Sequence, residues 1–66
     1  MQVYVNGDPR DLPPNTSLVD LISSLNLAAE RLAVELNRVV VRRSEWANTM
    51  LHENDRVEIV HFVGGG

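Results

Sequence analysis

The chain has 66 residues, enough for one small domain but close to the size below which a hydrophobic core alone no longer holds a fold. It contains no cysteine, which excludes disulfide bonds, thiolate metal sites and a thiol nucleophile of its own. The net charge of −3 argues against a nucleic-acid partner, and no apolar run approaches the roughly 20 residues that a membrane span requires. We therefore expect a soluble, cytoplasmic protein that does not bind membranes.

The first predicted element is a β-hairpin. Residues 1–5 alternate apolar and polar side chains, which is the period of a half-buried strand. Asn6-Gly7 follows at once and suits the two positive-φ positions of a type I′ turn. The returning segment, residues 8–12, contains Pro9, which has no N–H to donate to a neighbouring strand. This second strand is therefore expected to be short and to lie at an edge of the sheet.

The only long helix is predicted after this hairpin. Thr16 or Ser17 can act as N-cap, and with Ser17 in that role Asp20 falls at the N3 position, where a carboxylate suits the unpaired amides. The apolar residues that follow recur at the spacing of one helical stripe: Leu18, Leu21, Ile22 and Leu25. This stripe is expected to cover one face of a sheet.

The second half of the chain predicts a strand at residues 33–37, a strand at 39–41, one helical turn at 42–47, a polar turn at 51–56 and a strand at 57–63. Val34 and Leu36 are expected to point inward. Asn37-Arg38 makes the turn to the next strand, because Asn tolerates the left-handed region. Trp46 is predicted to be a core residue beneath the helical turn.

The order of these elements predicts the arrangement of the sheet. The first and last strands are the most apolar, so we expect them side by side at the centre, running parallel after the helical crossover. This is the β-grasp, or ubiquitin-like, fold: an α+β domain with a mixed sheet of about five strands and one main helix on one face. We expect a single β-grasp domain at residues 1–63 and a flexible C-terminal glycine tail at residues 64–66.

The last strand is expected to present two different faces. Val57 and Ile59 face the helix as core residues. Glu58, Val60 and Phe62 face the uncovered side, which Tyr4 on the neighbouring strand shares. Val60 and Phe62 then expose apolar area directly before the tail, which predicts a partner-binding patch. Ordinary exposed apolar surface is the alternative.

Three glycines end the sequence, Gly64, Gly65 and Gly66. Glycine has no Cβ and samples φ of either sign, so the tail is expected to be narrow and extended. Its terminal carboxylate on Gly66 could enter a tight channel in another protein and react there, which makes the tail a substrate. A disordered chain end is the alternative.

The ending His61-Phe62-Val63-Gly64-Gly65-Gly66 is the most specific motif of the chain, supported by Arg43-Ser44-Glu45-Trp46 and by residues 54–60. On these residues the chain resembles the ThiS family, the sulfur carriers of thiamin biosynthesis. Arg38 and Arg42 stand where this family usually has Gly and Pro, which leaves the shape of the loop around residues 39–41 open.

The resemblance implies a carrier and co-substrate rather than an enzyme. Gly66 would be adenylated by an activating enzyme similar to ThiF, which uses ATP and Mg²⁺. Sulfur from a cysteine desulfurase would then give a thiocarboxylate, which donates its sulfur to the thiazole ring on a synthase similar to ThiG. The chain itself is expected to bind no cofactor or metal and to be a monomer when free.

Other functions stay open at this point. The chain could be a carrier resembling MoaD or a tRNA-thiolation carrier, which use the same tail with a different acceptor. A protein-conjugating modifier and a noncovalent β-grasp binding module are further alternatives. An independent enzyme is disfavoured, because His52 and His61 have no evident nucleophile to serve.

Overall fold

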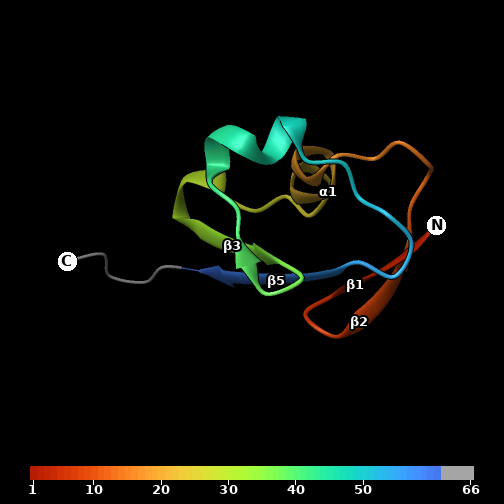
Figure 1. Ribbon diagram of the computed structural model, residues 1–66. Coiled ribbons are helices and arrows are strands. Elements are labelled where there is room, and N and C mark those ends of the chain that lie inside the picture. Colours follow the sequence, from red (N-terminus) through yellow and green to blue (C-terminus); the bar gives the residue numbers. More distant parts are fainter. Residues whose placement is uncertain (62–66) are drawn as a thin grey trace.

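The computed structural model describes residues 1–61 of the chain. In chain order its elements are β1 (Gln2–Val5), β2 (Asp8–Asp11), α1 (Leu18–Ser24), the 3₁₀ helix η1 (Ala29–Arg31), β3 (Leu32–Leu36), β4 (Val39–Val40), the 3₁₀ helix η2 (Arg43–Asn48) and β5 (Arg56–His61) (Figure 1). None of the helices within residues 1–61 has the length and apolar character needed to cross a membrane.

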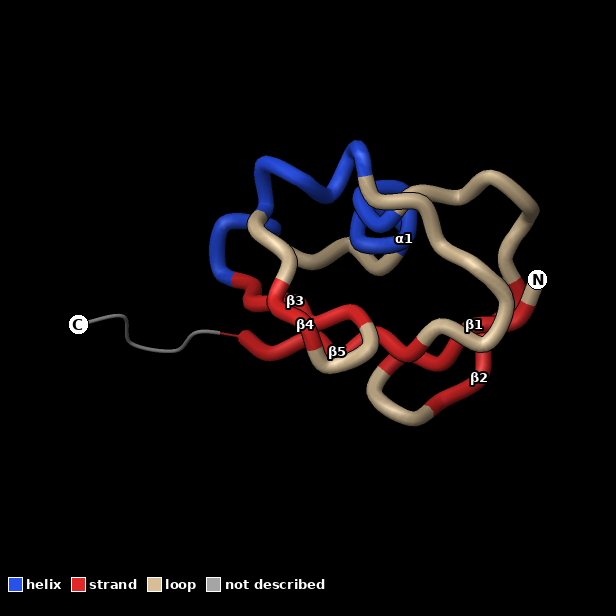
Figure 2. The backbone as a smooth tube through the Cα atoms, in the orientation of Figure 1, coloured by secondary structure: helices blue, strands red, loops and turns tan. Residues whose placement is uncertain are grey.

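The strands form one mixed sheet in the order β2-β1-β5-β3-β4. β1 and β5 run parallel at its centre, whereas the other neighbours are antiparallel. All helical segments lie on the same side of the strands (Figure 2). The predicted β-grasp fold is thereby confirmed, including the edge position of the strand that contains Pro9.

Both hairpins turn through pairs of residues with positive φ. Asn6 and Gly7 have φ values of 50° and 86°, and Asn37 and Arg38 have values of 51° and 70°. Two consecutive positive values are typical of a type I′ turn, whose twist matches that of the flanking strands. The loop that the sequence left open therefore keeps a tight hairpin form, with Arg38 in a conformation that glycine adopts more easily.

The start of α1 follows the predicted capping pattern. The Ser17 hydroxyl oxygen accepts a hydrogen bond from the Asp20 backbone N–H at 3.2 Å, and the Asp20 carboxylate accepts one from the Ser17 N–H at 3.3 Å. This reciprocal pair is a capping box, which satisfies two amides that the helix itself leaves unpaired. Leu25 is only half-buried, because the helix ends before it.

The core lies between the helical layer and the covered face of the sheet. Its buried apolar residues are Val3, Val5, Leu18, Leu21, Ile22, Leu32, Val34, Trp46, Leu51 and Val57. Trp46 is 2% exposed, as predicted, and its Nε1–H donates to the Val41 carbonyl at 2.9 Å. The prediction of a polar turn was wrong for Leu51, which is 3% exposed. Its backbone N–H donates to the Thr16 carbonyl, and this bond draws the segment under the helix.

Candidate functional site

β5 separates two kinds of surface by the alternation of its side chains. Val57 faces α1 and is fully buried, whereas Val60 is 59% exposed on the other side. Tyr4 pairs with Arg56 in the register of β1 and β5, so Tyr4 lies on the same side as Glu58 and Val60. The structure thus places the predicted site residues that fall within residues 1–61 on one side of the sheet. Their role in partner binding stays a prediction.

We call the sheet surface opposite α1 the open face. The strand registers place these residues on it: Tyr4, Ala33, Glu35, Val40, Arg56, Glu58 and Val60. Ala33 lies directly opposite Val60, next to the end of β5, and makes this part of the face apolar. Val40, at the sheet edge, is 68% exposed. The open face therefore has an apolar part near the end of β5 and a charged part nearer the start of β5.

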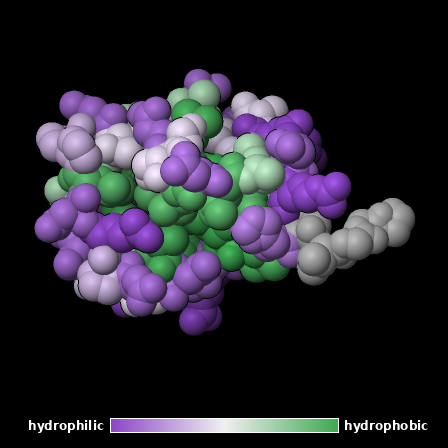
Figure 3. All heavy atoms as spheres, turned by 180° about the vertical axis from the view of Figure 1, so that it is seen from behind, coloured by the Kyte–Doolittle hydropathy of each residue, from purple (hydrophilic) through white to green (hydrophobic). Residues whose placement is uncertain are grey.

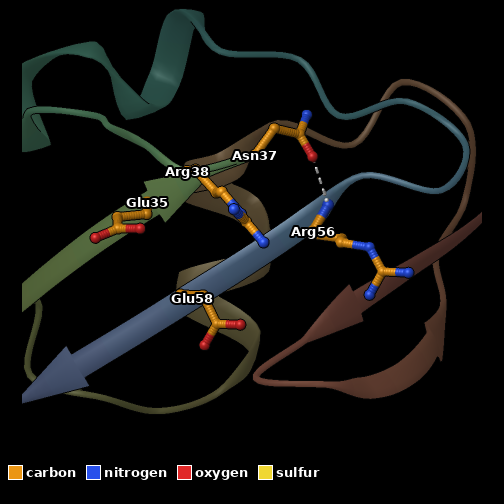
Figure 4. Close-up of a pocket in the computed structure, with 5 residues that line it drawn as sticks. All are labelled: Glu35, Asn37, Arg38, Arg56 and Glu58. Atoms are coloured by element: carbon orange, nitrogen blue, oxygen red, sulfur yellow. Dashed lines mark hydrogen bonds between the residues drawn. The ribbon is translucent and has the colours of Figure 1, made fainter.

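The charged part is hollowed. A hollow of about 750 Å³ is lined by Glu35, Asn37, Arg38, Arg56 and Glu58. In Figure 4 the Arg38 side chain extends from the β3–β4 turn over β5, with the two glutamates on one side and Arg56 on the other. Among the charged residues of this hollow, Glu58 alone was predicted from the sequence as a site residue. Glu35 and Arg56 could have been found by pairing strand 33–37 with the last strand.

Arg56 is held in place from two directions. Its guanidinium carbon lies 4.8 Å from the centre of the Tyr4 ring, a cation–π contact. Its backbone N–H donates to the Asn37 Oδ1 at 2.9 Å, and the Asn37 Nδ2 donates to the Asp55 carboxylate at 3.0 Å. The entry into β5 is thus fixed by the same turn that carries Arg38.

A second asparagine holds the other half of β5. The Oδ1 of Asn6 accepts from the Ile59 backbone N–H at 2.7 Å, and its Nδ2 donates to the Ile59 carbonyl at 3.2 Å. β1 ends at Val5, so this side chain continues the pairing of β5 where the neighbouring strand has stopped. The second half of β5 is therefore held by β3 on one side and by a turn of the first hairpin on the other.

The opposite side of β5 carries a smaller hollow of about 370 Å³. Its apolar lining comes from Val5, Leu25, Leu27 and Ile59, and polar side chains including the exposed His61 surround it. Figure 3 shows, on the face seen from behind, a band of apolar side chains between two hydrophilic borders. The half-buried residues that fringe the core, such as Leu27 and Ile59, supply apolar surface of this kind.

Several predicted site residues lie outside residues 1–61. The structure covers residues 1–61, so the predictions for Phe62, Gly64, Gly65 and Gly66 are not tested by it. Among the residues that it does cover, no group of three or more His, Asp or Glu side chains could hold a metal ion.

The chain is similar to known proteins over its whole length. The model of the ThiS family matches residues 3–66. The sulfur carrier protein ThiS of Bacillus subtilis is 36% identical over 65 residues, which cover 97% of this chain and 98% of that protein. A thiazole synthase of Magnetococcus marinus is 41% identical over all 66 residues. The chain spans about a fifth of the length of the thiazole synthases that it matches.

The fold agrees with a solved structure of the same kind. The crystal structure of the thiamine biosynthesis protein ThiS from Geobacter metallireducens superposes with a TM-score of 0.86 at 36% identity, and both chains are covered completely. The family model and the Bacillus relative each cover nearly the whole chain. The chain therefore belongs to the ThiS family of sulfur carrier proteins of thiamine biosynthesis, which are carriers and not catalysts.

Proposed function

We propose that the chain carries sulfur as a thiocarboxylate on Gly66. A carboxylate is a poor electrophile, so an activating enzyme similar to ThiF first joins it to the AMP part of ATP and releases pyrophosphate. The persulfide that a desulfurase forms from cysteine then attacks the acyl-adenylate and displaces AMP. A thiol reductant cleaves the resulting acyl disulfide and leaves the thiocarboxylate on Gly66. ATP and Mg²⁺ belong to the activating enzyme, and the chain supplies the carboxylate and the surface by which it is recognised.

The family match over residues 3–66 carries this proposal, because it includes the glycine ending. The geometry supports it in a second way. β5 lies between β1 and β3 and is held near its end by Asn6, so the chain leaves the folded part at a defined place. A reacting group on a short tail benefits from such a fixed origin, since small misplacements in an active site are costly in rate.

The partners follow from the same proposal. The activating enzyme docks on the open face through Tyr4, Glu58, Val60 and Phe62, with the glycine tail inserted into its active site. The similarity to thiazole synthases supports a synthase similar to ThiG as the acceptor of the sulfur. Both enzymes need the same tail, so they bind the carrier in turn.

Intact-mass spectrometry tests the proposal. The chain is incubated with the activating enzyme of the same organism, ATP, Mg²⁺, a desulfurase, cysteine and a thiol reductant. The expected product is heavier by the difference between one sulfur and one oxygen atom, and fragmentation should place the change on Gly66. A product in which the sulfur lies elsewhere, or no mass change at all, would contradict the proposal.

Tail variants sharpen this test. Gly65→Val places a branched side chain in a channel that takes bare glycine, and we expect thiocarboxylate formation to fall by about a hundredfold. One residue added after Gly66 should have a similar effect, because it keeps a carboxylate but changes the reach. Asn15→Gly, in the loop before α1, serves as the control and should react as the parent does.

A further inference from the structure

Two locally unfavourable features meet in the hollow of the open face. The first is the backbone of Arg38, whose φ of 70° lies in the left-handed region. A residue with a Cβ is strained there, and glycine would occupy the same turn position at lower cost. Such strain is most often retained where a side chain has a function.

The second feature is a pair of like charges. Glu35 on β3 lies directly opposite Glu58 on β5, and both side chains are exposed. Like charges in directly opposed positions of an antiparallel pair destabilise a sheet. The strain at Arg38 and this repulsion thus oppose folding at the same place, which points to a role for these residues outside the folded chain.

The charges of the hollow are not neutralised within the described part of the chain. Within residues 1–61, the one basic and acidic side-chain pair within 4.0 Å is His52 with Asp55, whose Nδ1 and Oδ2 atoms lie 3.9 Å apart. Glu35, Glu58 and Arg38 therefore have no ion-pair partner among these residues. Arg56 has its cation–π contact with Tyr4 but likewise no carboxylate within ion-pair distance.

The hollow suits a protein surface better than a small molecule. Sites for small ligands are mostly apolar and bury most of the ligand. This hollow is lined by four charged side chains and one amide, all of them exposed. Val60 follows Glu58 on the same side of β5, so the hollow adjoins the apolar part of the open face. Charged contacts of this kind raise association rates and select partners.

The tail itself gives a reason for such a surface. Glycines have no side chains, so an activating enzyme cannot tell this carrier from another glycine-ended carrier by Gly64-Gly65-Gly66 alone. The enzyme therefore has to distinguish the carriers by their folded domains. Activation is the step at which this selection matters, because an activated carrier goes on to receive sulfur.

We infer that the hollow is the site by which the activating enzyme selects this carrier. A basic side chain of the enzyme binds between Glu35 and Glu58, and an acidic one binds to Arg38 and Arg56. The inference rests on the proposed function and adds Glu35, Arg38 and Arg56 to the predicted docking residues. Its characteristic consequence is that relieving the strain or the repulsion stabilises the fold and weakens docking together.

Three variants test whether fold stability rises while docking weakens: Arg38→Gly, Glu35→Gln and Glu58→Gln. Each should raise the melting temperature of the carrier. Each should also raise the KM for the carrier in the activation reaction by about fivefold at low salt, with kcat unchanged. Added salt should raise the KM of the parent and reduce the difference between parent and variants, because screening weakens exposed charge pairs.

Two matched controls lie outside the open face. Asn15→Gly introduces glycine at another position of positive φ, 66°, in a different loop, and Glu30→Gln removes an exposed carboxylate in η1. Both controls should keep the KM of the parent.

The outcomes separate this inference from the proposed function. A parent chain that is not activated at all contradicts the proposed function and the inference with it. An active parent whose three variants keep its KM overturns the inference alone, as does a KM that rises only when the melting temperature falls. A defect confined to sulfur transfer on the thiazole synthase would assign the hollow to that enzyme and also overturn it.

Discussion

The two faces of the sheet use similar side chains for opposite purposes. On the covered face Val3, Val34 and Val57 are almost fully buried, whereas Val40 and Val60 on the open face are more than half exposed. Val57 and Val60 lie three residues apart on β5. In a chain of 66 residues one face must supply nearly all the apolar burial, which leaves the other free for recognition. Stability and partner binding should therefore be separable by single substitutions.

The largest expected effect is on the covered side. Trp46→Ala removes the largest fully buried side chain and should lower the free energy of unfolding by about 3 to 5 kcal/mol. That is a large part of the roughly 3 to 10 kcal/mol typical of a domain of this size. Urea denaturation measures it. Trp46→Phe keeps most of the volume and loses the bond to Val41, so a loss as large as that of Trp46→Ala would contradict the packing argument.

The same substitution on both faces tests the comparison directly. Val57→Ala should cost about 2 kcal/mol of unfolding free energy, because two buried methyl groups are lost and a cavity is left. Val60→Ala should change the unfolding free energy by less than about 0.5 kcal/mol, as exposed substitutions usually do. Thermal and urea denaturation of the two variants give the result. Equal losses would mean that the open face contributes to the core.

The open face is expected to matter for binding. Val60→Asp should leave the melting temperature nearly unchanged but weaken binding to the activating enzyme by about 1 to 2 kcal/mol, since it places a charge in the apolar part of the interface. Calorimetry with the purified enzyme measures the affinity. Unchanged affinity would remove Val60 from the docking surface.

The smallest expected effect is that of removing the two hydrogen bonds from the Asn6 side chain to β5. Asn6→Gly keeps the positive-φ turn but removes both side-chain bonds to Ile59, at a cost of about 1 kcal/mol. Amide hydrogen exchange measures the local effect. We expect faster exchange at Ile59 and unchanged exchange at Val34. If the exchange at Ile59 stays as in the parent, Asn6 does not fix the end of β5.

Much of the fold could be predicted from short stretches of sequence. The Asn6-Gly7 turn, the capping box of Ser17 with Asp20 and the alternation along β5 each depend on residues close in the chain. The family resemblance was equally local, since the glycine ending and Arg43-Ser44-Glu45-Trp46 can be recognised without knowing the fold. Local backbone preferences and side-chain periodicity are properties of a few neighbouring residues, so they are visible before any packing is known.

The remaining features depend on residues that are distant in the sequence. Leu51 is buried because its backbone hydrogen bond to Thr16 draws a polar segment under the helix. The opposition of Glu35 to Glu58 follows from the register of β3 against β5, strands that are separated by β4 and η2. Register is set by which apolar side chains fit together in the core, and a shift of one residue would turn every side chain to the other face. The charged hollow therefore exists only in the folded chain, because packing on the covered face decides which charges meet on the open one.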